Sequence, residues 1–118
     1  MYSEVFLDHF KNPRNVGELE SPAVTVQIEN PVCGDILRLS ARFEADRIAD
    51  VRYKVRGCTA AIASGSALSE WMKGKTRAEL AALKAETIES EVGGLIPESK
   101  HAAVLCLDGV RKLLHDSH

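Results

Sequence analysis

The residues of this 118-residue chain best suited to chemistry are its three cysteines, one histidine and one carboxylate. Cys33-Gly34-Asp35 places a thiol beside a carboxylate, Cys58 directly follows a glycine, and His101 lies five positions before Cys106. A cysteine thiolate can bind zinc or iron, accept sulfur, or act as a nucleophile. A free cysteine is also commonly a small apolar side chain in a core. The surrounding elements must therefore decide between these uses.

Cys58 is predicted at a corner between a strand and a helix. Residues 51–56 alternate between apolar and charged side chains, which is typical of a half-buried strand. The alternation stops at Gly57, which suits a sharp turn because it has no Cβ. A run of small residues with helical spacing then begins at Cys58. At a helix N-terminus the dipole and the free backbone N–H groups favour a thiolate, so we expect the pKa of Cys58 to be lowered.

Cys33 and Cys58 are predicted to be neighbours despite their separation in the chain. Apolar and polar residues alternate over residues 24–28, 37–43 and 48–56, and the links between these segments are short. Three such strands should form an antiparallel meander, in which the second strand begins where the third ends. Two thiolates and the Asp35 carboxylate at one sheet end repel one another unless a cation is present. A metal ion is therefore the natural partner of such a cluster, and ordinary core or surface roles for these residues are the alternative.

The last predicted helix, over residues 100–114, carries His101 and Cys106 in its opening turns. If this helix starts near the same sheet end, His101 supplies a fourth ligand. A set of Cys33, Asp35, Cys58 and His101 suits tetrahedral zinc, and it equally suits an iron–sulfur cluster with mixed ligands.

The remaining pattern predicts an α+β fold in a single domain, residues 1–118. Further helices are expected over residues 3–10 with Ser3 as N-cap, over 58–72, over 77–83 behind a Thr76/Glu79 capping box, and over 87–92. A three-stranded antiparallel sheet with helices packed on one face follows. The other face would collect five cations, which indicate a solvated face or, as the alternative, a docking surface: Arg38, Arg42, Arg52, Lys54 and Arg56.

Composition excludes several classes of function. The 15 basic and 17 acidic residues are nearly balanced, so no global signature of nucleic-acid or membrane binding is present. An odd number of cysteines without a Cys-x-x-Cys pair argues against a disulfide framework and a thioredoxin-type motif. The sequence shows no signal peptide and no apolar run long enough to span a bilayer, so we expect a reduced, cytoplasmic protein.

At this level of detail the chain resembles the IscU/NifU-type iron–sulfur cluster assembly scaffolds, including the SufU branch. The resemblance covers nearly the whole chain in the right order, and five segments carry it: 2–17, the Cys33-Gly34-Asp35 loop, 57–64 (GCTAAIAS), 70–75 (EWMKGK), and 95–101 with its histidine. It implies the fold of these scaffolds and a carrier that is not an enzyme.

The resemblance also implies a function. In this family a cysteine desulfurase delivers sulfur, iron is added, and a transient [2Fe–2S] cluster is built and passed to recipient apo-proteins. Carried over by position, Cys33, Asp35, Cys58 and His101 are the ligand set for iron or zinc. An iron donor and an Hsp70-type chaperone are further partners that the family implies, with a monomer or weak homo-oligomer as the assembly.

The chain departs from the family pattern at its third cysteine. Ala102 stands at that position, and Cys106 lies four residues, or one helical turn, beyond it. Cys106 is then either a substitute cluster ligand or a core residue. Ser99 stands where the chaperone-recognised segment of the family has a lysine, and the insertion that the SufU branch carries before its last helix is absent.

Two other functions compete with the scaffold. One is a zinc-holding relative that binds metal without assembling clusters. The other is a sulfur relay in which Cys58 or Cys33 receives a persulfide from a desulfurase.

Overall fold

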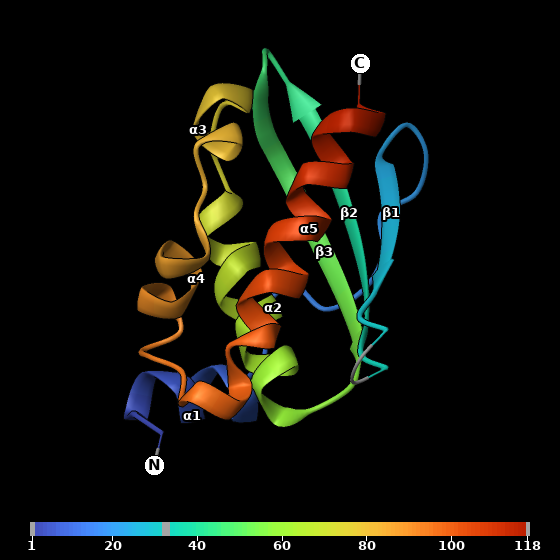
Figure 1. The fold of residues 1–118 in the computed structure, drawn as a ribbon. Coiled ribbons are helices and arrows are strands. Elements are labelled where there is room, and N and C mark those ends of the chain that lie inside the picture. Colours follow the sequence, from blue (N-terminus) through green and yellow to red (C-terminus); the bar gives the residue numbers. More distant parts are fainter. Residues whose placement is uncertain (1, 32–33, 118) are drawn as a thin grey trace.

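The computed structural model describes residues 2–31 and 34–117 (Figure 1). Helices and strands follow one another along the chain as α1 (Glu4–Lys11), β1 (Val24–Glu29), β2 (Ile36–Glu44), β3 (Arg47–Arg56), α2 (Thr59–Met72), α3 (Arg77–Ala81), α4 (Ala85–Glu91), the 3-10 turn η1 (Pro97–Ser99) and α5 (His101–Asp116). The predicted α+β class is confirmed.

The sheet is the antiparallel meander that the alternating pattern predicts, with strand order β1-β2-β3. Leu39 in the central strand faces Val26 on one side and Tyr53 on the other. The chain before β1 also joins the sheet, because the Tyr53 N–H donates to the Asn15 carbonyl at 2.9 Å. The Gly17 N–H returns a bond of 2.9 Å to the Tyr53 carbonyl. The segment before β1 therefore lies along the outer edge of β3.

Helices α2 and α5 cover one face of the sheet (Figure 1). The strand residues that point toward them form the centre of the core and are at most 2% exposed: Leu37, Leu39, Ala41, Val51 and Tyr53. Alternation places the cations on the opposite face. There Arg38 contacts Glu18 at 2.9 Å and Arg42 contacts Glu44 at 2.7 Å, while Arg52 pairs with Asp50. Ion pairs of this kind, between side chains in contact with solvent, are expected on a solvated sheet face.

The small residues of α2 allow it to pack closely on β3. A Cβ at Gly65 would lie 2.6 Å from Cε2 of the Tyr53 ring, so only glycine fits over this ring. The Tyr53 hydroxyl donates to the Ile62 carbonyl at 3.0 Å, which fixes the same contact by a hydrogen bond. The alanine- and serine-rich half of α2 is therefore a packing surface.

The helix ends follow the predicted caps. The Ser3 hydroxyl accepts from the Phe6 N–H at 3.1 Å, and Thr76 and Glu79 form the capping box. α3 ends at Ala81, two residues early, because the Leu83 N–H turns back to the Leu80 carbonyl. Within the described residues, no helix is long and apolar enough to span a bilayer.

Candidate metal centre

Asp35 reaches the helix-covered face through the register of β2 and β3. Ile36 pairs with Arg56, so the next pair outward is Asp35 opposite Gly57. Because side chains alternate, Asp35 shares the face of Leu37 rather than that of Ile36. Its side chain is accordingly buried, with 4% of the residue exposed. The turn that leads into it is closed by two bonds, from the Asn30 N–H to the Asp35 carbonyl and from the Gly34 N–H to the Asn30 carbonyl.

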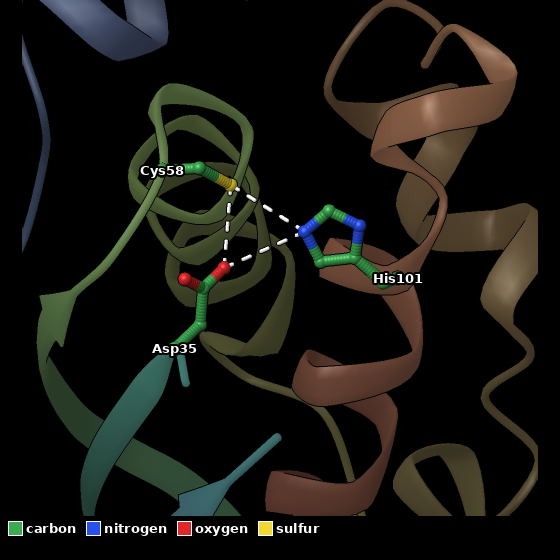
Figure 2. Close-up of side chains that lie close together, drawn as sticks. All are labelled: Asp35, Cys58 and His101. Atoms are coloured by element: carbon green, nitrogen blue, oxygen red, sulfur yellow. Dashed lines mark hydrogen bonds and ion pairs between the residues drawn. The ribbon is translucent and has the colours of Figure 1, made fainter. Parts of the chain in front are cut away.

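Cys58 is the N-cap of α2, as the predicted corner requires. The backbone N–H groups of Ala61 and Ile62 bond to the Cys58 carbonyl, which starts the helix. The residue is exposed, and its sulfur is directed toward Asp35 and the last helix (Figure 2). The thiol donates to Asp35 Oδ2 at 3.2 Å.

His101 opens α5, and its ring is oriented by the backbone. Nδ1 lies 3.1 Å from the Glu98 carbonyl oxygen, which can only accept, so Nδ1 carries the proton. With Nδ1 as the donor to this carbonyl, Nε2 is the nitrogen that faces the site, an arrangement common in metal-binding histidines. Nε2 lies 3.5 Å from Cys58 Sγ and 3.5 Å from Asp35 Oδ2.

The three donor atoms form a compact triangle and come from the residue before β2, the N-cap of α2 and the first residue of α5 (Figure 2). Bond lengths typical of tetrahedral zinc would separate sulfur from a nitrogen or oxygen ligand by about 3.5 to 3.6 Å, and nitrogen from oxygen by about 3.3 to 3.5 Å. The two separations from His101 Nε2, 3.5 Å each, match this spacing, while the 3.2 Å between Cys58 Sγ and Asp35 Oδ2 is the shorter distance of a thiol–carboxylate hydrogen bond. Sulfur, imidazole and carboxylate are also an accepted mixed set for zinc or iron. The group therefore fits a metal without rearrangement of the backbone.

The expected lowering of the Cys58 pKa is wrong. Partial burial of the thiol is the largest effect and raises its pKa, and the neighbouring Asp35 carboxylate raises it further. Hydrogen bonds from the backbone N–H groups of Ala61 and Ala60 lower the pKa, as predicted, but they do not outweigh the effects of burial and Asp35. In the metal-free protein the thiol therefore keeps its proton for the hydrogen bond to Asp35, and a metal ion must displace that proton.

Cys106, the candidate substitute ligand, lies in the hydrophobic core instead. It is 0% exposed, and burial raises the pKa of its thiol to about 12. It lies five positions after His101, and on an α-helix this offset turns its side chain by about 140° from that of the histidine. The structure therefore brings Cys106 into the core and not to the triangle.

Two other positions complete the description of the site. Cys33 lies outside the described residues, so its predicted place beside Asp35 stays a prediction. Ala102, which stands at the position of the family's third cysteine, is 0% exposed.

Two contributors were not found from the sequence. Glu98 contributes its backbone carbonyl, which any residue at that position would have, so the sequence could not indicate this role. The sequence predicts Gly57 only as a turn former, and it is the observed register of β2 and β3 that places it opposite Asp35.

Comparison with known proteins decides the family. The family model for the NifU-like N-terminal domain matches residues 1–116. The chain belongs to this family.

Curated relatives of this NifU-like domain match it almost end to end. The iron–sulfur cluster assembly scaffold protein IscU of Azotobacter vinelandii is 40% identical over 98% of this chain and 92% of its own length. The protein of the same name from Aquifex aeolicus is 42% identical over 98% of this chain and 74% of its own. The Escherichia coli IscU is 37% identical over 98% and 92%.

Solved structures agree on the fold. A crystal structure of a hypothetical protein superposes with a TM-score of 0.77 at 27% identity, covering 94% of each chain. A putative iron–sulfur cluster assembly scaffold protein for the SUF system from Fervidobacterium islandicum gives a TM-score of 0.76 at 22% identity over 96% of each chain. The predicted resemblance to IscU and NifU proteins is thereby confirmed, and the protein of the SUF system shares the fold.

Proposed function

We propose that this protein is a scaffold on which a [2Fe–2S] cluster is assembled and from which it is passed to apo-proteins. The observation that carries the proposal is the convergence of Asp35, Cys58 and His101 at one end of the sheet. The family supports it, since the relatives above are named as iron–sulfur cluster assembly scaffolds. Cys33, next to Asp35 in sequence, is proposed as the fourth ligand.

The donor set suits a cargo that has to leave again. The soft Cys58 thiolate favours sulfide-bridged iron, whereas the Asp35 carboxylate is a harder and weaker ligand for it. His101 presents Nε2 on a ring that the Glu98 carbonyl already holds in position. Both α2 and α5 begin at the site, so the positive ends of two helix dipoles face an anionic cluster.

The family suggests which partners act on this cargo. Sulfur is expected from a cysteine desulfurase, and recipient apo-proteins take the finished cluster. An iron donor and an Hsp70-type chaperone are proposed on the resemblance alone.

Anaerobic reconstitution with ferrous iron, cysteine and a desulfurase tests the proposal. We expect visible absorption from sulfide-bridged iron, iron and sulfide in equal amounts, and transfer of the cluster to an apo-ferredoxin. A colourless protein that retains one tightly bound zinc per chain would contradict the scaffold and support the zinc-holding alternative.

A sulfur relay is the second candidate, because Cys58 is exposed and a desulfurase could reach it. Mass spectrometry after desulfurase turnover without iron would then find a persulfide on Cys58 or Cys33. A persulfide that forms while no cluster appears with iron present would favour the relay over the scaffold.

A further inference from the structure

Gly57 faces Asp35 at the point where the paired strands β2 and β3 end. Directly opposite side chains on antiparallel strands normally have Cβ atoms about 4.5–5.5 Å apart. A Cβ built on Gly57 would instead lie 2.5 Å from Asp35 Cγ, 2.5 Å from Oδ1 and 2.9 Å from the Asp35 Cβ. The carboxylate therefore occupies the space that any other residue at position 57 would fill.

The backbone does not itself require glycine here. The described glycines with left-handed φ are Gly17, Gly34, Gly74, Gly93 and Gly94. Gly57 is outside that group, so its φ is one that an alanine can adopt. What distinguishes the position is the approach of the Asp35 side chain. A glycine needed only for its backbone conformation would not have a carboxyl group packed against its Cα.

The two carboxylate oxygens are used differently. Oδ1 lies against the open side of Gly57, while Oδ2 faces the Cys58 sulfur at 3.2 Å and His101 Nε2 at 3.5 Å. Asp35 is only 4% exposed, so it has little freedom to move outward when its space is taken. A methyl group at position 57 would force the carboxyl group out of the position from which Oδ2 meets the two other donor atoms.

We propose that Gly57 is a positioning residue for the metal centre. Because Gly57 has no side chain, the Asp35 side chain can extend across the strand pair to join Cys58 and His101. The inference rests on the proposed function to the extent that these three side chains bind metal. It adds a residue that touches no metal and acts through Asp35.

Cobalt(II) titration of the metal-free protein, read by visible d–d bands and thiolate charge-transfer absorption, tests this inference. In Gly57→Ala we expect an affinity about 10- to 100-fold weaker than in the wild type, the range typical when a residue that orients a ligand is changed. The d–d bands should shift as the carboxylate leaves the coordination sphere. Gly57→Ala with the affinity and spectrum of the wild type would overturn the inference.

Two further variants separate positioning from general damage. Asp35→Gly removes all three atoms that the methyl group would meet, so Gly57→Ala/Asp35→Gly should bind cobalt no more weakly than Asp35→Gly alone. Gly74→Ala strains a left-handed glycine that has no atoms within 4 Å of an added Cβ, and it should leave the affinity unchanged. Gly57 would not act through Asp35 if adding Gly57→Ala to Asp35→Gly weakened cobalt binding by the same factor as Gly57→Ala does in the wild type. A loss of cobalt affinity in Gly74→Ala as large as that in Gly57→Ala would also contradict this role.

A crystal structure of metal-free Gly57→Ala keeps the inference distinct from the proposed function. It should show the Asp35 carboxyl group moved away from Cys58 and His101 with the sheet otherwise intact. If the wild type bound no cobalt, the proposed metal centre would fail, while this structure would still decide whether Gly57 positions Asp35. An Asp35 side chain left in place beside the new methyl group would refute the inference.

Discussion

At the scale of single residues, the centre depends on where protons and lone pairs lie. The Glu98 carbonyl holds the proton of His101 on Nδ1, and the Asp35 carboxylate accepts the proton of the Cys58 thiol. Nε2 is therefore the His101 nitrogen directed at the site, whereas the Cys58 sulfur must first lose a proton. Metal binding should release that proton to solvent.

Replacing Cys106 tests its assignment to the core. Cys106→Ala removes one buried sulfur, so we expect the free energy of unfolding to fall by about 1 kcal/mol. Cluster assembly should proceed as in the wild type. Chemical denaturation and reconstitution measure the two effects, and loss of the cluster in a folded variant would return Cys106 to the ligand set.

Ala102→Cys tests how the absence of a cysteine at this position affects release of the cluster. The new thiol would follow His101 in the first turn of α5, at the position of the family's third cysteine. A further soft ligand should slow release of the reconstituted cluster to a chelator or an apo-ferredoxin by several-fold, because thiolate binds iron more tightly than carboxylate does. Release at the wild-type rate would mean that the thiol stays in the core, where Ala102 now lies.

At the level of the helices, a hydrogen bond to the His9 side chain of α1 connects this helix to α2. His9 Nδ1 lies 2.8 Å from the Ser66 hydroxyl and 3.1 Å from Arg14 Nη1. Since an arginine can only donate, Nδ1 acts as an acceptor and the ring is neutral. Burial lowers the pKa of His9, and the charge of Arg14 lowers it further against the opposing effect of Asp8, Glu70 and Glu91.

This histidine predicts a pH dependence of stability. Because the folded protein has the lower His9 pKa, the unfolded chain binds the proton first as the pH falls. The stabilisation should be complete above the unfolded value of about 6.5 and decline as the pH falls from there toward the folded pKa. Urea denaturation between pH 7.5 and 5 measures it, with His9→Gln as the comparison. An equal slope in both proteins would contradict the assignment.

Much of this architecture could be predicted from short-range patterns. The meander, the Ser3 cap and the Thr76/Glu79 capping box depend on neighbouring residues, and the meander alone predicted that Asp35 and Cys58 would meet. The pKa of Cys58 could not be predicted, because the helix dipole competes with burial and with a carboxylate whose distance depends on packing. The depth of Cys106 depends on how α5 is rotated against the sheet, which helical spacing alone does not determine.

At the scale of the whole molecule, the two ends of the sheet serve different purposes. One end gathers the starts of α2 and α5 around the metal centre. At the other, Arg77 joins three parts of the chain, with Nε 3.0 Å from Asp46 Oδ1, Nη1 2.7 Å from Ser117 Oγ, and the guanidinium carbon 3.9 Å from the centroid of the Phe43 ring. This end holds the end of α5 against the β2–β3 hairpin.

Arg77→Lys should therefore separate stability from metal binding. Lysine keeps the charge but loses the planar fork that contacts Asp46, Ser117 and the Phe43 ring. We expect the protein to lose about 1 to 2 kcal/mol of stability, judged from the usual worth of such contacts. Cobalt affinity should stay unchanged when it is measured well below the melting temperature. A parallel loss of cobalt affinity would show that the two ends are coupled.

In the proposed scaffold, Asp35, Cys58 and His101 hold the iron of an assembling cluster. Iron K-edge X-ray absorption of the reconstituted protein tests it most directly. In the wild type we predict sulfur scattering together with a nitrogen or oxygen neighbour and the outer-shell scattering of an imidazole ring. His101→Ala should lose the imidazole scattering while its fold is retained. A first shell of sulfur alone, unchanged in His101→Ala, would contradict the account.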